Sequence, residues 1–152
     1  MTSCHEKTPG LVAWAAGFFE GEGSITIQKR RRRGYSSRFA YILRVGVGQR
    51  DTKPLELLKA YWGGTYHQLG HRPSWEWFIS SNQASRFLKD ISPYLQFRGG
   101  LVELAFEFFN SIGKPGKWVT REKEEYREGL RNKVLELNGY FKRKKSKKQG
   151  VE

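Results

Sequence analysis

A short apolar run ends in two acids and two glycines in the stretch Ala15-Ala16-Gly17-Phe18-Phe19-Glu20-Gly21-Glu22-Gly23. Thr8 and Pro9 precede this run, and such a pair favours a helix start because threonine caps free amides and proline fits the first turn. The sequence predicts a helix that begins there and stops within residues 20–23, where two glycines break it. A carboxylate at the end of an apolar helix is costly to bury unless a cation meets it, and a divalent metal ion is one such cation.

Small residues recur at every fourth position of the same predicted helix, at Ala13, Gly17 and Gly21. This spacing puts them on one helix face, and a stripe of small residues lets two helix backbones approach closely. We therefore expect this face to contact a second copy of the chain. The alternative interpretation is an amphipathic core helix that ends in a glycine turn.

The rest of the chain predicts an α+β fold. Alternation of apolar and polar residues predicts strands at about residues 24–30, 38–49, 65–69 and 74–80. Helical spacing predicts further helices at about residues 52–62, 83–91, 99–112 and 120–137. We expect a four-stranded antiparallel sheet with helices packed on one face. A single domain at 9–138 is expected between an N-terminal arm at 1–8 and a basic tail at 139–152.

Net charge points to a polyanionic partner. The chain of 152 residues carries a formal charge of +13, with five consecutive basic residues from Lys29 to Arg33 and a second basic run at 142–148. The segment up to Phe141 alone has 22 basic and 14 acidic residues, so the excess belongs to the folded domain and not only to the tail. Nucleic acid is the first candidate partner and an anionic membrane surface the second.

Composition excludes several other classes. One cysteine, Cys4, allows no intrachain disulfide, and three scattered histidines argue against a zinc site. No apolar run approaches the roughly 18 residues that span a bilayer. The chain is therefore expected to be a soluble intracellular protein of a prokaryotic cytoplasm or an organelle, with no membrane partner and no small-molecule substrate.

The nine-residue stretch resembles the signature of the LAGLIDADG homing endonuclease family. Ala16 and Gly17 match the alanine and first glycine of that signature, while Glu20 and Glu22 take the places of its two acids. Both acids are glutamate where aspartate is commoner, and alanine replaces the first leucine. Nothing in residues 101–152 repeats the signature. The resemblance therefore implies the single-motif type, which pairs through the first helix as a homodimer.

Two segments farther along the chain agree with this resemblance, which covers about residues 9–112. Gln49 and Lys53 look like the family's active-site glutamine and the basic residue four positions later. Arg98 lies where the family usually has its second active-site base, a lysine. Taken singly, Gln49 is also consistent with a helix cap, and the two cations with ordinary surface charges.

The resemblance implies a metal-dependent double-strand cut at a long pseudo-palindromic DNA target, with short 3′ overhangs on the products. The implied biological role is intron or intein homing. Glu22 and the carbonyl of Gly21 would hold Mg²⁺, for which Mn²⁺ is expected to substitute, and Ca²⁺ is expected to support binding without cleavage. Lys53 and Arg98 would hold the phosphate, and Gln49 would order water. Glu20 points about 200° away from Glu22 on a helix, and is expected to support the helix end.

The non-core positions of the strands are the expected contacts with double-stranded DNA, because arginine and glutamine pair with base edges in the major groove. The candidate contacts are Ser24, Thr26, Gln28, Arg30, Arg31, Arg32, Arg33, Tyr35, Arg38, Ile42, Arg44, Gly46, His67, Arg72 and Glu76. A charged, solvated sheet face is the alternative interpretation of these positions. The rival functions are a non-cleaving nucleic-acid binder on the same fold, such as an intron maturase, and an unrelated RNA-binding protein.

Overall fold

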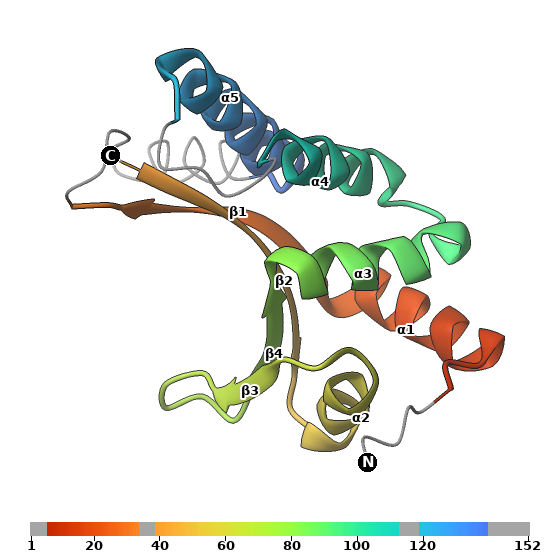
Figure 1. Ribbon diagram of the computed structural model, residues 1–152. Helices are drawn as coiled ribbons and strands as arrows, with labels where there is room; N and C mark the ends of the chain where they lie inside the picture. Colours follow the sequence, from red (N-terminus) through yellow and green to blue (C-terminus); the bar gives the residue numbers. More distant parts are fainter. Residues whose placement is uncertain (1–5, 34–38, 113–118, 140–152) are drawn as a thin grey trace, which may run out of the picture.

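The computed structural model describes residues 6–33, 39–112 and 119–139, which form one sheet and its covering helices (Figure 1). The strands are β1 (Gly23–Arg31), β2 (Phe39–Gln49), β3 (Thr65–Gln68) and β4 (Trp75–Ser80). The helices are α1 (Pro9–Glu22), α2 (Thr52–Trp62), α3 (Ser81–Ile91), α4 (Gly99–Ile112) and α5 (Arg121–Leu137), with a short 3₁₀ helix η1 (Ser92–Tyr94) after α3.

The four strands form an antiparallel sheet in the order β1-β2-β4-β3. Figure 1 shows the helices on one side of this sheet, while the β3–β4 hairpin reaches toward the other side. The expected α+β fold is confirmed. Among the described residues one face of the sheet carries no helix, and we call it the helix-free face.

Strand register sorts the side chains between these two faces. Ile25 lies opposite Val45, which lies opposite Ile79, and all three are almost fully buried beneath the helices. Successive strand residues point to opposite faces, so the residues between them belong to the helix-free face. The alternation in the sequence thus assigned both faces correctly.

An aromatic cluster joins the sheet to three helices. The ring of Phe87 on α3 lies edge-on to Phe19 of α1, Trp62 of α2 and Trp77 of β4, with centroids 5.8, 5.0 and 5.3 Å away. Edge-to-face rings at these separations are favourable beyond the apolar area that they bury. The cluster fixes the end of α1 against the sheet.

Helix α1 begins as predicted, because the Thr8 side chain accepts the Leu11 amide at 3.2 Å and Pro9 occupies the first turn. It also stops within the predicted stretch, at Glu22. Gly21 stays helical, however, and only Gly23 acts as a stop. A Cβ at residue 23 would collide with the ring of Phe19, so glycine is required there for close packing and not for an unusual φ.

Some expected features shift or lie outside the described residues. Helix α3 begins at Ser81, two residues before the expected start at 83. The strands expected at 65–69 and 74–80 form a hairpin, in which the Leu69 amide donates to the Ser74 carbonyl at 2.9 Å. The candidate contacts Tyr35 and Arg38, the loop at 113–116 and the tail from residue 140 lie outside the described residues. None of the described helices is both long enough and apolar enough to cross a membrane.

Candidate functional site

The end of α1 carries the acid that the sequence analysis singled out. Glu22 is the last helical residue, its side chain is exposed, and within the described part of the chain it has no hydrogen bond or ion pair. Gly21 is also exposed and lies in the last turn, where helical carbonyls lack partners within the helix. An accessible carboxylate and an accessible carbonyl oxygen therefore lie next to each other at the helix end.

Glu20 has a different environment, although it lies only two residues earlier. Its carboxylate accepts the backbone N–H of Phe97 at 2.8 Å and also that of Gln96. These bonds connect α1 to the loop between η1 and α4. Glu20 is half-buried and uses its oxygens to hold this loop, which agrees with the supporting role expected for it.

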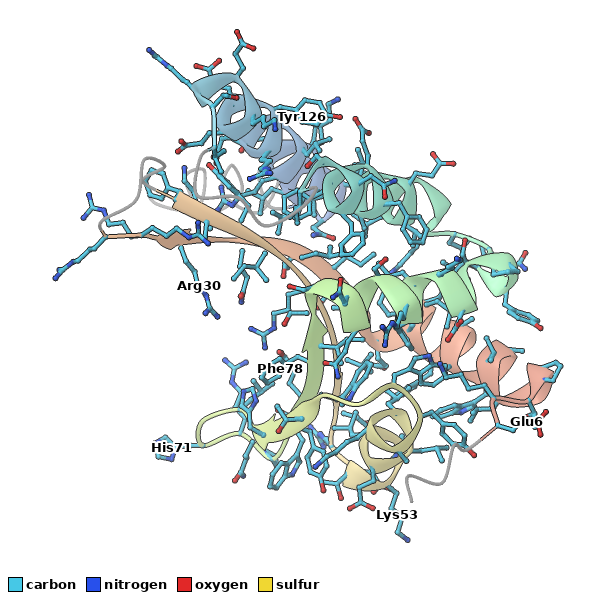
Figure 2. The ribbon with its side chains drawn as sticks, viewed as in Figure 1. Glu6, Arg30, Lys53, His71, Phe78 and Tyr126 are labelled. Carbon is cyan, nitrogen blue, oxygen red and sulfur yellow. The ribbon has the colours of Figure 1, made fainter. Side chains whose placement is uncertain are left out.

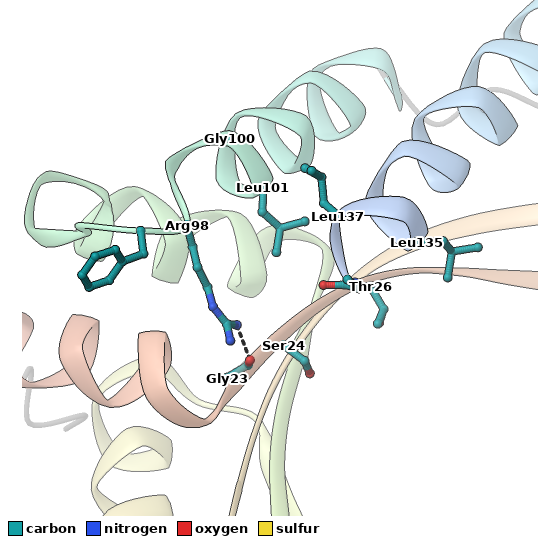
Figure 3. A pocket seen from close by; sticks show the side chains of 10 residues that line it. Gly23, Ser24, Thr26, Arg98, Gly100, Leu101, Leu135 and Leu137 are labelled. Carbon is teal, nitrogen blue, oxygen red and sulfur yellow. Dashed lines mark hydrogen bonds between the residues drawn. The ribbon is translucent and has the colours of Figure 1, made fainter. Parts of the chain in front are cut away.

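Arg98, at the end of the same loop, reaches the junction of α1 and β1. Its guanidinium donates to the carbonyl of Gly23, and its Cζ lies 5.5 Å from the centre of the Phe19 ring (Figure 3). A pocket of about 600 Å³ opens beside it, between the start of β1 and the facing ends of α4 and α5. The structure thus places a fixed positive charge one residue beyond Glu22.

Gln49 and Lys53 differ in their position relative to the end of α1. Gly23 lies opposite Val47, so the end of β2 that carries Gln49 adjoins the end of α1. The Gln49 side chain accepts the amide of Arg50 at 2.8 Å. Lys53 is exposed in the first turn of α2 and points away from α1 in Figure 2. The strand end that carries Gln49 and the guanidinium of Arg98 thus adjoin the junction of α1 and β1, whereas Lys53 points away from α1.

The helix-free face carries most of the candidate DNA contacts of the strands, whereas Arg31 falls on the same side of β1 as the buried Ile25 and Ile27. Thr26, Arg44 and Ser80 form one row across β1, β2 and β4, and Gln28 lies opposite Ile42 in the next row. Gly48, Glu76 and His67 form a row nearer the β3 edge. Figure 2 shows Arg30 and Phe78 on this side, away from the helices. His71 and Arg72 lie at the tip of the second hairpin, where both are exposed.

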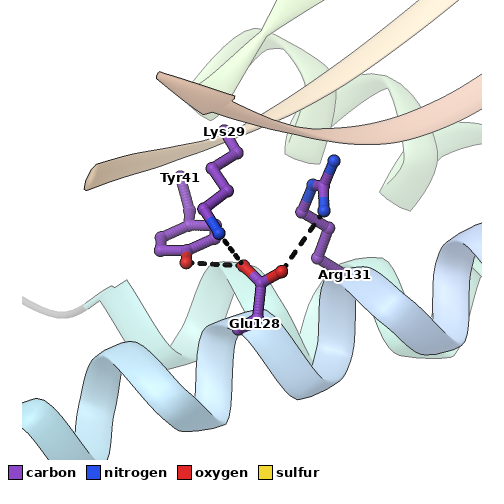
Figure 4. A network of polar contacts seen from close by, with 4 residues as sticks. All are labelled: Lys29, Tyr41, Glu128 and Arg131. Atoms are coloured by element: carbon purple, nitrogen blue, oxygen red, sulfur yellow. Dashed lines mark hydrogen bonds and ion pairs between the residues drawn. The ribbon is translucent and has the colours of Figure 1, made fainter. Parts of the chain in front are cut away.

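The basic run that starts at Lys29 divides between the two sides of the sheet. Lys29 turns toward the helices and pairs with Glu128 of α5 at 3.1 Å (Figure 4). Arg32 also lies near α5, since its charge adds to the effect of burial in lowering the pKa of Arg127. Arg30, on the other face, donates to Gln28 at 3.3 Å. The structure therefore does not present the whole run on the helix-free face.

A polar network on α5 is a feature that the sequence analysis missed. Besides Lys29, the Glu128 carboxylate accepts the Tyr41 hydroxyl at 2.6 Å and one guanidinium N–H of Arg131 at 3.3 Å (Figure 4). Burial acts to raise the pKa of Glu128, but the hydrogen bonds from Tyr41 and Lys29 together lower it below its ordinary value. Burial and the hydrogen bond between its hydroxyl and the Glu128 carboxylate raise the pKa of Tyr41. The network fixes the far end of the β1–β2 hairpin to α5.

Phe97 is a second residue that the sequence analysis missed. Its side chain is 90% exposed, although its backbone N–H is held by the Glu20 carboxylate. It lines a shallow pocket with Ala13, Gly17 and Gly21 of α1. The signal available in the sequence was an aromatic residue between the helices expected at 83–91 and 99–112.

Several solved structures share this fold. The homing endonuclease I-CvuI, in complex with the I-CreI target in 2 mM Mg with the DNA not cleaved, aligns with a TM-score of 0.70 and 22% identity over 81% of this chain and 78% of that chain. The archaeal intron-encoded homing endonuclease I-Vdi141I, complexed with DNA, aligns with a TM-score of 0.72 and 14% identity over 82% of each chain. I-SmaMI bound to cleaved DNA aligns with a TM-score of 0.68 and 21% identity, over 78% of this chain but 42% of that chain.

Sequence comparison identifies the family. No curated protein sequence matches the chain significantly. A family model for LAGLIDADG endonucleases matches residues 15–97, a segment that includes Glu20, Glu22 and Gln49 and stops one residue before Arg98. The match spans more than half of the chain, and the structural likenesses above agree with it. The chain therefore belongs to the LAGLIDADG endonuclease family.

Proposed function

We propose that the chain works as a homodimer that cuts both strands of double-stranded DNA in a divalent-metal-dependent reaction. The target is a long pseudo-palindromic sequence, the products carry short 3′ overhangs, and the biological role is intron or intein homing. One observation carries the proposal. Glu22, exposed and without a partner among the described residues, lies where an exposed stripe of small residues on α1 meets the helix-free face of the sheet.

The exposed face of α1 supports dimerisation. Ala13, Gly17 and Gly21 are all exposed, and a Cβ built at Gly17 or Gly21 would meet no atom within 4 Å. The single chain thus leaves a smooth helix face that a second α1 can approach closely. Each chain offers one accessible acid at this place, and cutting two strands requires two such acids. Pairing through α1 would bring both to the centre of one DNA site.

The donors at the end of α1 fit a magnesium ion. No group of three or more His, Cys, Asp or Glu side chains gathers among the described residues, so this part of the chain alone builds no closed metal cage. Mg²⁺ keeps several waters and is typically held by one or two carboxylates together with substrate phosphates. Glu22 and the Gly21 carbonyl would supply the protein's share. When bound, the metal ion would lower the pKa of a water molecule and stabilise charge on the phosphate.

The surrounding residues would position the phosphate and the water. Arg98 is held at Gly23 and, as an arginine, stays cationic, so it would offset charge on the scissile phosphate without moving a proton. Gln49 would orient water from the neighbouring strand end. Lys53 would contact the phosphate only after its side chain turns toward α1, and its role rests on the family resemblance alone.

The helix-free face fits the major groove of DNA. It presents a chain of donors and small residues, among them Thr26, Gln28, Arg30 and Arg44, on a curved antiparallel sheet. Such a sheet can lie along a major groove and read base edges. The net charge of +13 gives the attraction to phosphates that precedes sequence reading.

A direct test is to incubate the full chain with a library of palindromic DNA duplexes in Mg²⁺ and to sequence the cut ends. The expected result is one family of cut sequences, symmetric about a centre and with short 3′ overhangs. Sedimentation on the same preparation should show a dimer. Sequence-selective binding without any cut in Mg²⁺ or Mn²⁺ would contradict the proposal and favour the non-cleaving binder.

A further inference from the structure

Arg44 and Glu76 form an ion pair on the helix-free face, although they lie on different strands. The Arg44 guanidinium donates to Glu76 Oε1 at 2.5 Å, and its Cζ lies 4.3 Å from the centre of the Phe78 ring. In the register of β2 and β4, Arg44 lies opposite Ser80, four residues from Glu76. The arginine side chain therefore runs along β4, over Phe78, before it meets the carboxylate.

Gly46 leaves room for this arrangement. It lies opposite Phe78, and a Cβ at residue 46 would come within 3.4 Å of Glu76 Oε1. The side chains of the pair are only 25% and 27% exposed, so water screens them less than a fully exposed pair. The ring of Phe78 and the carboxylate together hold the guanidinium in one orientation before any ligand arrives.

The fixed guanidinium keeps most of its hydrogen-bonding capacity. An arginine side chain has five N–H donors, and the contact with Glu76 uses one guanidinium nitrogen. The neighbours of Arg44 across the strands are the short residues Thr26 and Ser80. A cluster of donors and a carboxylate acceptor therefore lie side by side on the surface that the proposed function gives to DNA.

We propose that Arg44 and Glu76 act as one unit that reads a single G·C pair in each half of the DNA target. Arginine donates to O6 and N7 of guanine, and glutamate accepts the N4 amino group of cytosine. Within one G·C pair these groups are neighbours on the major-groove edge, as the two side-chain ends are neighbours here. Glu76 thereby acts as a specificity residue and as the positioning residue of Arg44.

The carboxylate would also disfavour thymine or guanine in the place of cytosine. Thymine presents O4, and guanine presents O6 and N7, all of which are acceptors that repel a carboxylate. Specificity often depends on such repulsion as much as on the favourable contact. Arg44 lies opposite Thr26, and this row of the sheet is closer to Glu22 than the row that holds Arg30. The G·C pair should therefore fall in the part of each half-site that is nearer the cut.

The inference rests on the proposed function, and its test uses a binding readout. Duplexes from a palindromic library are selected in Ca²⁺ with the wild type and with Glu76→Gln, Glu76→Asp, Arg44→Gln and the Glu76→Gln/Arg44→Gln double variant. Glu76→Asp keeps the charge but shortens the reach by one methylene. Glu103→Gln is the matched control, because Glu103 is exposed on α4 and its loss changes net charge equally.

Each single variant at Arg44 or Glu76 should lower the preference for G·C by about tenfold at the same symmetric pair of positions. The double variant should lower it little further, since residues that act together give non-additive effects. Glu103→Gln should leave the base preferences unchanged. A Glu76→Gln profile equal to that of Glu103→Gln, or Arg44 and Glu76 effects at different positions, would overturn this inference alone. A wild type that selects no sequence would overturn the proposed function and this inference with it.

Discussion

The carboxylate of Glu20 accepts the backbone amide of Phe97 at 2.8 Å, and this bond ties the end of α1 to the loop that ends in Arg98. The Gln96 amide binds the same carboxylate, and Arg98 binds back to the carbonyl of Gly23. The loop therefore donates backbone hydrogen bonds to Glu20 in α1 and a side-chain hydrogen bond to the residue that follows α1. The first acid of the motif serves this connection, while the second acid has no partner within the described residues.

Glu20→Gln should lower stability and only partly reduce cleavage. An amide offers one acceptor oxygen in place of two and turns an N–H₂ group toward a backbone donor. The expected cost is roughly 1–3 kcal/mol of unfolding free energy. Urea denaturation and single-turnover cleavage measure the two effects. Unchanged stability would show that the two hydrogen bonds contribute nothing.

Glu22→Gln should behave in the opposite way. Glu22 has no partner among the described residues, so the neutral isostere should leave stability within about 0.5 kcal/mol of wild type. Cleavage should fall by roughly a thousandfold or more, because metal stabilisation of the transition state is worth several kcal/mol. Binding of target DNA in Ca²⁺-free buffer should persist. Cleavage at near the wild-type rate would place the active site elsewhere.

Alternation was enough to predict both faces of the sheet from sequence. Ile25, Val45 and Ile79 are buried and their neighbours Thr26, Arg44 and Ser80 face away from the helices, as a period of two requires. The expected stop of the first helix within residues 20–23 placed Glu22 at the end of α1. These predictions depend only on local spacing, which is why they succeeded.

Contacts between distant segments could not be predicted in this way. Tyr41 and Glu128 are 87 positions apart, and no local pattern joins them. Alternation puts Lys29 on the same side of β1 as Ile25 and Ile27, but nothing in the local sequence gives Glu128 as its partner. Lys53 was grouped with Glu22 by resemblance, but the direction of α2 depends on how Leu55 and Leu58 pack against the sheet. Tertiary packing decides such positions.

Gly17→Leu should separate the dimer without unfolding the chain. A Cβ added at residue 17 meets no atom within 4 Å in the single chain, so the monomer should accept a side chain there. In a close helix pair it would overpack the interface on both sides, at about 1–3 kcal/mol or more. Sedimentation velocity should show a monomer, and double-strand cleavage should disappear.

Gly129→Leu is the control for that change. Gly129 is an exposed glycine of α5, and an added Cβ there also meets nothing within 4 Å. Both substitutions replace a helical glycine, so their effects on helix propensity should match. Only the variant at residue 17 should change the oligomeric state. A dimer that survives Gly17→Leu would place the interface on another surface.

Two adjacent basic residues should differ in their effect on DNA binding. Arg30→Gln should weaken binding to all sequences alike, and should reduce the slope of log K against log salt by about 0.9 for each phosphate that the protein no longer neutralises. Lys29→Gln removes the same charge from the helix side, where Lys29 pairs with Glu128. It should leave the slope nearly unchanged and lower stability instead. Titrations at several salt concentrations separate the two, and equal slopes for both variants would refute the assignment of faces.

Glu128 should make folding sensitive to acid. Its pKa in the folded chain is lowered, because the hydrogen bonds from Tyr41 and Lys29 outweigh the effect of burial. A group with a lowered folded pKa stabilises the fold above its unfolded pKa and loses that contribution as pH falls through the folded value. Wild type should therefore exceed Glu128→Gln in unfolding free energy at neutral pH, and the difference should shrink as pH drops below the ordinary glutamate range. Urea denaturation of both proteins across this range measures it. A constant difference would mean that the ionised carboxylate does not stabilise the β1–β2 hairpin against α5.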